Sequence, residues 1–158
     1  MFENGARYEG EFLDDKKHGK GKYTEKEGKS YEGSFKNDQI DGEGIMKYAD
    51  GKRIEGKWVA GKLNGNCKYN WHDGTSYVGM YKNEKKHGWG KFKWDETREY
   101  EGQWKNGKQH GIGKFVDYNG KVKYGLWLNG KREKWVKEKD FKVKKEEKSP
   151  EDEDEQEA

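Results

Sequence analysis

The sequence contains little of what stabilises most small domains. Its only cysteine is Cys67, so the chain cannot form an internal disulfide. Hydrophobic residues make up 28% of the 158 residues and charged residues 41%, which is close to the composition of disordered chains. No hydrophobic run approaches the length of a signal-peptide core or a membrane span. We therefore expect a soluble, cytoplasmic protein without a thick globular core.

Aromatic residues are the exception. They make up 15% of the chain, including seven Trp and ten Tyr. Because these rings carry most of the apolar surface, any core has to be built from aromatic contacts. An extended array that buries surface one repeat at a time fits this composition better than a globule.

A 23-residue unit recurs without a slip, and its clearest copy is Tyr100–Val122, YEGQWKNGKQHGIGKFVDYNGKV. We number each unit from its first residue, as positions 1 to 23. Position 3 is always glycine: Gly10, Gly33, Gly56, Gly79, Gly102 and Gly125. Position 5 is always aromatic: Phe12, Phe35, Trp58, Tyr81, Trp104 and Trp127. Full units span 8–30, 31–53, 54–76, 77–99 and 100–122, with partial units at 1–7 and 123–139. A fixed period of this length predicts a repeat array.

Each unit has the pattern of a β-hairpin. Positions 1–6 and 12–18 alternate with a period of two, which predicts strands. Positions 7–11 form one turn, and Asp or Asn followed by Gly marks a second, as at Asn119-Gly120. The sequence therefore predicts an all-β fold, a single-layer antiparallel meander of 23-residue β-hairpin repeats.

The turn lengths predict a register. A four-residue loop within the unit places position 1 opposite 16, 3 opposite 14 and 5 opposite 12. A three-residue loop between units, a type I turn ending in a glycine bulge, continues this pairing. One face then carries an aromatic row, a glycine row, and a row in which large rings alternate with glycine, such as Trp104 beside Gly88 and Gly111. Because strands lie about 4.8 Å apart, each large ring needs a bare backbone beside it.

The same register predicts a charge ladder on the opposite face. Positions 2 and 15 face each other and read Glu9, Lys22, Glu32, Ile45, Glu55, Lys68, Val78, Lys91, Glu101 and Lys114. Opposite charges directly across strands contribute about 0.2–1 kcal/mol each. The next row on this face, positions 4 and 13, starts polar and ends apolar, with Trp89, Ile112, Leu126 and Trp135.

This apolar patch requires a cover, and the region after Lys134 is the nearest candidate, with Phe141 and Val143 as contacts. The charge changes in the same region. Residues 1–132 carry 27 basic and 20 acidic residues, net +7, whereas residues 133–158 carry 7 and 11, net −4. Because the charge rises and Pro150 breaks any helix, we expect residues 140–158 to form a charged, largely disordered tail.

The unit YEGxWxxGxxHGxGxxxxxDGxx resembles the MORN repeat, the membrane occupation and recognition nexus. The resemblance covers residues 8 to about 131 and rests on motifs that recur in phase, such as Tyr100-Glu101-Gly102 and His110-Gly111. The departures are Asp41 and Asn64 at the histidine position, Cys67 for the second glycine and Thr97 for the turn glycine. We expect these to weaken single hairpins without breaking the array.

The resemblance implies a curled, single-layer sheet that is used for attachment. Families with such repeats include junctophilins, plant phosphoinositide kinases, radial-spoke head proteins and cytoskeletal organisers of protists. By analogy, we expect a non-enzymatic scaffold or adaptor in a cytoskeletal, ciliary or cortical assembly, with a membrane-associated placement as an alternative.

A single-layer sheet has no second layer over its aromatic face, and a large exposed apolar surface is typical of a partner site. We therefore predict an aromatic groove that binds a protein segment, such as an amphipathic helix. The predicted contacts are Phe12, Phe35, Trp58, Tyr77, Tyr81, Tyr100, Trp104 and Trp127.

Lysines in the turns support an alternative, attachment to anionic phospholipids such as phosphoinositides at about 1 kcal/mol per lysine. These lysines are Lys16, Lys17, Lys62, Lys85, Lys86, Lys108 and Lys131. Acidic residues in the same turns, among them Asp14 and Glu84, dilute this edge. Self-association through the open edge strands is a further alternative.

Other kinds of site find no support in the sequence. His87 and His110 lie two strands apart, about 9–10 Å between backbones, which is too far for one metal ion and favours a structural role in the turns. No nucleophile, base and orienting group recur together, so we predict neither an enzyme nor a cofactor. The interleaved Glu residues fit nucleic acid poorly. Cys67 holds a glycine-row position and is predicted to be a small packed residue.

Overall fold

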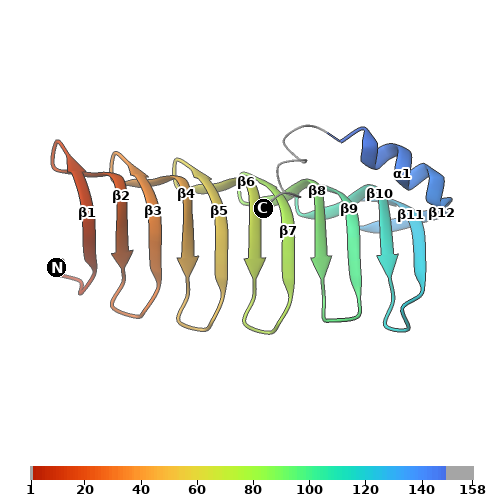
Figure 1. The fold of residues 1–158 in the computed structure, drawn as a ribbon, viewed down its shortest axis with the longest axis horizontal. Helices are drawn as coiled ribbons and strands as arrows, with labels where there is room; N and C mark the ends of the chain where they lie inside the picture. The colour runs from red at the N-terminus through yellow and green to blue at the C-terminus, as the bar shows by residue number, and fades with distance from the viewer. Residues whose placement is uncertain (1, 149–158) are drawn as a thin grey trace.

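The computed structural model describes residues 2–148, which form one open antiparallel sheet of twelve strands and one helix (Figure 1). The strands lie in the sheet in chain order. They are β1 (Arg7–Leu13), β2 (Lys16–Thr24), β3 (Ser30–Lys36), β4 (Gln39–Lys47), β5 (Arg53–Val59), β6 (Lys62–Asn70), β7 (Ser76–Lys82), β8 (Lys85–Lys93), β9 (Glu99–Lys105), β10 (Lys108–Val116), β11 (Val122–Leu128) and β12 (Lys131–Val136), followed by the helix α1 (Glu138–Glu146). The predicted all-β meander of hairpin repeats is confirmed.

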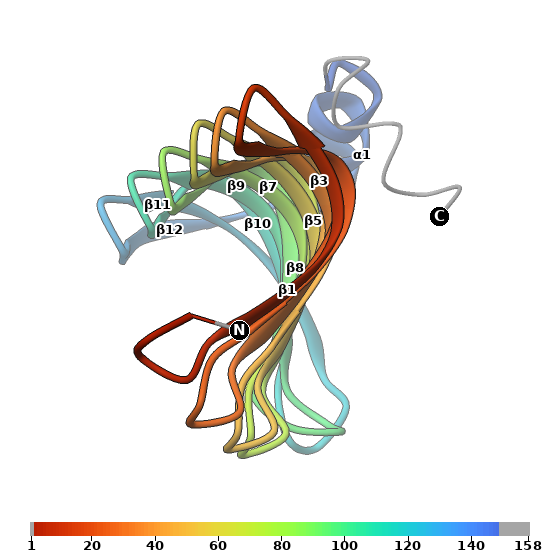
Figure 2. The same cartoon turned by 90° about the vertical axis from the view of Figure 1, so that its left-hand side faces the viewer.

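The strands are strongly bent, so the sheet has a C-shaped outline when viewed along its length (Figure 2). The aromatic residues of positions 1 and 5 line one side, which we call the aromatic face. The other side, which carries the charge ladder, is the back face. Helix α1 lies on the outside of the bend, on the back face (Figure 2).

The predicted register holds over most of each unit. Within the unit 100–122, Phe115 faces Tyr100 and Gly113 faces Gly102. The charge ladder is also confirmed, because Lys114 faces Glu101 there, and Lys22 faces Glu32 between the first two units. Positions 1, 2 and 3 are therefore aligned with 16, 15 and 14.

The glycine rows exist because a tyrosine ring lies across them. A Cβ atom on Gly113 would lie 2.3 Å from Cε2 of Tyr100, and one on Gly102 would lie 2.8 Å from its hydroxyl oxygen. The position 1 tyrosine of four units donates its hydroxyl to the carbonyl oxygen of position 4, at 2.7–3.1 Å. Burial raises the pKa of one of them, Tyr31, to about 12, so its hydroxyl remains a neutral donor. No larger residue than glycine fits beneath these rings.

Edge-to-face contacts connect the units. Each of these tyrosines meets the position 5 ring of its own unit and that of the next, with centroids 5.0–5.7 Å apart and planes at 82–89°. Tyr100, for example, packs between Trp104 and Trp127. Such pairs contribute about 0.5–1.5 kcal/mol beyond their buried area, and they give one face an aromatic core that is interrupted at Ile54 in the unit 54–76.

The loop within each unit differs from the prediction. It contains two residues, not four, and both have positive φ, as at Asn106 (φ 51°) and Gly107 (φ 82°), the geometry of a type I′ turn. Two extra residues of the following strand then form a bulge, so Trp104 faces Gln109 and not Gly111. Gly111 (φ 91°) supplies the left-handed backbone of that bulge. The prediction missed the tight turn because a bulge and a longer loop use the same number of residues.

The loops between units have the predicted form. The backbone amide of Gly120 donates to the carbonyl oxygen of Asp117, and the backbone amide of Asp117 donates to the carbonyl oxygen of Lys121. Gly120 has a φ of 80°. Where Thr97 replaces this glycine, the carboxylate of Asp95 accepts the backbone amides of Thr97 and Arg98 at 2.9 and 2.8 Å. These bonds, with that to the Thr97 hydroxyl, lower the pKa of Asp95 strongly. A side-chain cap therefore replaces the missing glycine.

The last hairpin corrects the predicted position of Trp135. Strand β12 has one extra residue where the earlier units have two, so Trp135 faces Gly125 and Lys134 faces Leu126. Because side chains alternate along a strand, this one-residue difference moves Trp135 out of the predicted apolar row and onto the aromatic face. The guanidinium of Arg132 lies 3.8 Å from the centroid of its ring there.

Helix α1 corrects the predicted disordered tail. The helix begins where the carboxylate of Asp140 accepts the backbone amide of Lys137 at 3.0 Å, and it buries Phe141. The predicted contact by Phe141 is confirmed, but Val143 points outward and is 56% exposed. The part of the predicted tail at 149–158 lies outside the described residues.

A compensated pair tests the tyrosine–glycine arrangement. In the unit 54–76, Ile54 replaces the tyrosine and Cys67 replaces the position 14 glycine that the ring would cover. We expect Ile54→Tyr alone to lower the free energy of unfolding by about 1–3 kcal/mol through overpacking. In the double variant with Cys67→Gly, the lost free energy of unfolding is recovered. Urea unfolding of the single and double variants should give a coupling free energy of about 1 kcal/mol or more between the two substitutions. Additive effects of the two substitutions would contradict the arrangement.

A second prediction concerns the type I′ turns. Glu84 occupies the second turn position with a φ of 68°, where three other units have glycine. Left-handed backbone costs a non-glycine residue about 1–2 kcal/mol, less for Asp and Asn. We expect Glu84→Gly to raise the free energy of unfolding by about 1 kcal/mol. Gln39→Gly, at an exposed strand position, is the control and should lower the free energy of unfolding.

Candidate protein-binding site

The eight aromatic residues predicted to contact a partner do come together, but mainly as the core. Seven of them are at most 7% exposed, and Phe12, on the edge strand β1, is 59% exposed. The expectation that the aromatic face stays largely uncovered was wrong for the seven buried residues. The sheet bends around them, and each of these seven rings packs against a tyrosine or tryptophan of a neighbouring unit.

Most of the accessible rings of the aromatic face belong to positions 16 and 18. They are half-buried and pack against the core from outside: Tyr23, Tyr48, Tyr69, Trp71, Phe92, Trp94 and Phe115. Position 16 was part of the predicted aromatic row, whereas position 18 was missed. Its signal is present in the sequence, because Tyr48, Trp71 and Trp94 follow one another at the repeat period.

The predicted basic edge divides into two groups. Lys16, Lys62, Lys85, Lys108 and Lys131 are exposed along the turns. Lys17 and Lys86 instead fold over aromatic rings. Burial lowers the pKa of Lys86. The exposed part of the edge is therefore smaller than predicted.

Two of the position 11 residues join neighbouring units, in line with the structural interpretation of the histidines. Nδ1 of His110 accepts the backbone amide of Asn129 at 3.3 Å, and Asp41 accepts that of Ala60 at 3.0 Å in the same way. Asp41 thus preserves the link where histidine is replaced. Within residues 2–148, no three His, Cys, Asp or Glu side chains are grouped to hold a metal ion. Cys67 is 4% exposed, as predicted for a packed residue.

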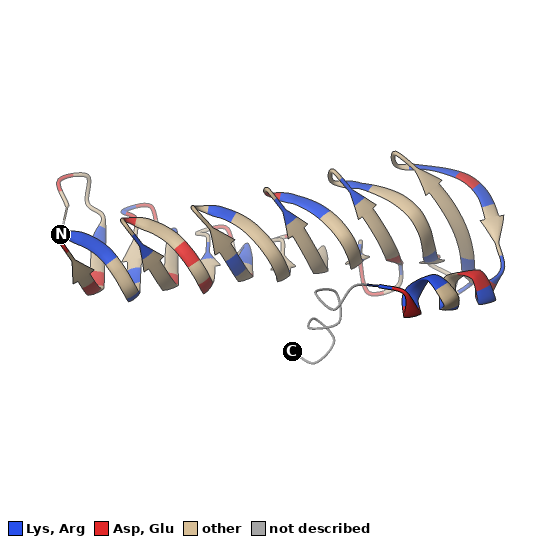
Figure 3. Ribbon diagram, turned by 90° about the horizontal axis from the view of Figure 1, so that it is seen from above, with Lys and Arg blue, Asp and Glu red and all other residues tan. Residues whose placement is uncertain are grey.

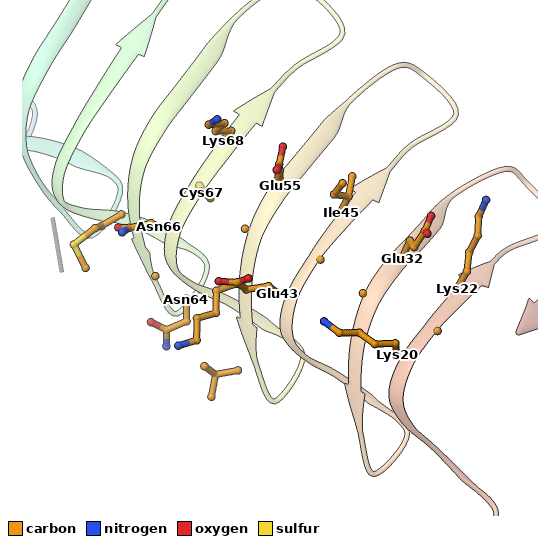
Figure 4. Close-up of a pocket in the computed structure, with 18 of the residues that line it drawn as sticks. Lys20, Lys22, Glu32, Glu43, Ile45, Glu55, Asn64, Asn66, Cys67 and Lys68 are labelled. Atoms are coloured by element: carbon orange, nitrogen blue, oxygen red, sulfur yellow. The ribbon is translucent and has the colours of Figure 1, made fainter. Parts of the chain in front are cut away.

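The back face contains a groove of about 1130 Å³ that runs across the first four units (Figure 4). Two rows of side chains rise from successive strands along it, the rows of positions 2 and 15 and of positions 4 and 13. Figure 4 labels one row as Lys22, Glu32, Ile45, Glu55 and Lys68, and the other as Lys20, Glu43 and Asn66. Glycine backbone forms the floor between them, at Gly21, Gly33, Gly44 and Gly56.

Helix α1 occupies the same two rows further along the sheet. Phe141 packs on Trp89 of position 13, with ring centroids 5.8 Å apart, and on Tyr124 of position 2, at 5.4 Å. The ammonium group of Lys145 bonds the carboxylate of Glu101, also at position 2. Figure 3 shows this charged helix beside the C-terminal strands. Helix α1 therefore packs on the C-terminal end of the back face, and the groove lies at the other end of the same face.

Glu101 is the electrostatic centre of this contact. Its side chain is 17% exposed, and burial acts to raise its pKa. The hydrogen bond from Lys145 and the charges of Lys145, Lys91 and Lys114 outweigh this effect, so the pKa of Glu101 lies below its ordinary value of 4.5. Its stabilising contribution is therefore complete above pH 4.5 and is lost as the pH falls through the lowered value.

The sequence model of the MORN repeat matches residues 8–24, 31–53, 55–76 and 100–122, more than half of the chain. The chain belongs to the MORN repeat family. The MORN hairpin also forms at 77–99, outside the matched stretches, where Thr97 and Val78 depart from the motif. No curated protein matches the chain. MORN repeats generally form non-enzymatic scaffolds. In residues 2–148, no helix is long and apolar enough to cross a membrane.

The seating of α1 can be tested by removing one lysine. Lys145→Met leaves Glu101 half-buried without its closest cation, so we expect at least a fivefold loss of hydrogen-exchange protection in residues 138–146. Lys142→Met is the matched control, because its partner Glu138 is exposed and such pairs contribute little.

The pH dependence provides an independent check of the same contact. Protection factors of α1, corrected for intrinsic exchange, should fall below pH 4.5 in the wild type. In the Glu101→Gln variant, the protection factors of α1 should fall less steeply with decreasing pH. Equal hydrogen-exchange protection of α1 in the Lys145→Met and Lys142→Met variants would contradict the assigned contact.

Proposed function

We propose that this MORN protein is a non-enzymatic scaffold that binds a helical segment of another protein in the back-face groove of its first four units. The observation that carries the proposal is the seating of α1 on the same two rows at the other end of the sheet. A surface that accepts one helix at positions 2 and 13, through a buried Phe and an ion pair, has the geometry to accept another at the same positions nearby.

The groove indicates what such a helix carries. Ile45, Val59, Val78 and Met80 supply apolar contacts on strands β4, β5 and β7. Glu and Lys side chains of the two back-face rows flank them in equal number: Glu9, Glu32, Glu43, Glu55, Lys20, Lys22, Lys57 and Lys68. The matching segment has an apolar stripe bordered by charges of both signs. Apolar contacts would provide the affinity, and the alternating charges would fix the direction and register of the helix.

This proposal moves the predicted contact from the aromatic face to the back face. The buried rings hold the shape of the sheet, and their truncation would unfold it before it revealed a binding role. Attachment to anionic lipid through the exposed turn lysines remains the alternative, and cytoskeletal, ciliary or cortical placement remains a prediction by family analogy.

A groove variant with a matched control tests the proposal. Ile45→Glu with Val78→Glu adds two charges to the groove, and Val122→Glu with Leu128→Glu adds the same charges at exposed apolar positions outside it. In affinity capture from the organism that encodes the protein, quantified by mass spectrometry, the groove variant should lose its protein partner at least tenfold. The control variant should retain the partner within twofold.

Three outcomes would count against this function. The partner could be retained by a groove variant with a native circular dichroism spectrum, or lost equally from both variants. Alternatively, sedimentation with anionic liposomes that weakens as salt rises would favour the lipid alternative.

A further inference from the structure

Position 10 of each unit lies on the aromatic face, and in the unit 77–99 it holds a caged lysine. The ammonium nitrogen of Lys86 lies 5.3–5.7 Å from the centroids of four rings. These rings are Trp71, Tyr77, Phe92 and Trp104, which occupy position 18 of the preceding unit, positions 1 and 16 of the same unit, and position 5 of the next. At this distance an aromatic face attracts a cation.

The first unit repeats this arrangement. The ammonium of Lys17 lies 5.2–5.7 Å from the ring centroids of Phe2, Tyr8 and Tyr23. Phe2 stands 23 residues before Glu25, so it holds position 18 of the preceding unit, and Tyr8 and Tyr23 hold positions 1 and 16. Two units of the chain therefore place their own lysine over rings at the same repeat positions.

The unit 100–122 has the complete set of rings without the cation. Trp94, Tyr100, Phe115 and Trp127 hold the four cage positions, and position 10 is Gln109. The pair Trp94–Phe115 has centroids 5.9 Å apart, the same as Trp71–Phe92 in the lysine cage. The pair Tyr100–Trp127 is edge-to-face at 5.0 Å, and Tyr77–Trp104 is edge-to-face at 5.7 Å. The ring geometry is thus retained where the intramolecular charge is missing.

We infer that this cage binds a cationic side chain of another protein, a lysine or its methylated form. Tyr100 and Trp127 are buried and form the floor, whereas Trp94, Phe115 and Gln109 are half-exposed and form the rim. Gln109 carries no charge, and its flexible side chain can move aside for an ammonium group. The cage lies on the opposite face from the groove, so this inference stands independently of the proposed helix site.

Methylated lysine is the sharper probe, because methylation retains the charge, weakens hydration and increases contact with the rings. We would label the tryptophans with 5-fluorotryptophan and titrate N-acetyl-trimethyllysine amide, assigning the Trp94 and Trp127 signals with Trp→Phe variants. The expected result is a saturable shift of these two signals. The neutral isostere, in which carbon replaces the quaternary nitrogen, should bind at least fivefold more weakly.

Two substitutions at equivalent positions make the test specific. Gln109→Lys should place an intramolecular cation in the cage, abolish the shift and raise the melting temperature. Lys86→Gln should open the equivalent cage and add a second set of shifting signals, from Trp71 and Trp104.

Any of four results would overturn the inference. These are the absence of a saturable shift at tens of millimolar, equal binding of the neutral isostere, unchanged binding by a folded Gln109→Lys variant, and an equal shift with phosphatidylcholine vesicles. The last result would assign the cage to a lipid choline headgroup.

Discussion

The structure depends on a tyrosine ring that lies across two glycines on paired strands. The ring of Tyr100 occupies the space where Gly102 and Gly113 would carry Cβ atoms, and its hydroxyl donates to the carbonyl oxygen of Gln103. The ring then presents its faces and edges to the large aromatic residues of two successive units. Because the tyrosine and both glycines are needed together, their positions are coupled. Ile54 and Cys67 depart from the pattern as a pair for this reason.

This arrangement lets a sheet of one layer have a core. An ordinary sheet buries one face against a second layer, whereas here the strands bend around rings that cover one another. The back face is then free of any packing requirement in the first units, and its side chains form a ladder of opposite charges over half-buried glycine backbone. The groove is therefore a consequence of how the other face is packed.

The sequence predicted what depends on period and alternation: the repeat, the pairing of positions 1 to 3 with 16 to 14, and the charge ladder. It did not predict the two-residue turn, although Gly61, Gly107 and Gly130 mark it in three units, because a tight turn followed by a bulge uses the same number of residues as a longer loop. Alternation assigned the aromatic residues to one face but carried no information on curvature, so their burial was missed. Helix α1 was missed because one buried residue, Phe141, holds a segment otherwise rich in charge.

The two ends of the array differ mainly through their back-face residues. Rows that carry Lys20, Glu43 and Lys57 in the first units carry Trp89, Ile112 and Leu126 in the last, and α1 packs on this apolar end. The hairpins from β1 to β10 are paired in the same register, and only the last hairpin, β11–β12, has one extra residue instead of two. The side chains of the back-face rows thus confine a helix of the chain to one end. Substituting residues of the back-face rows can change where a helix binds along this sheet without altering the tyrosine–glycine core on the other face.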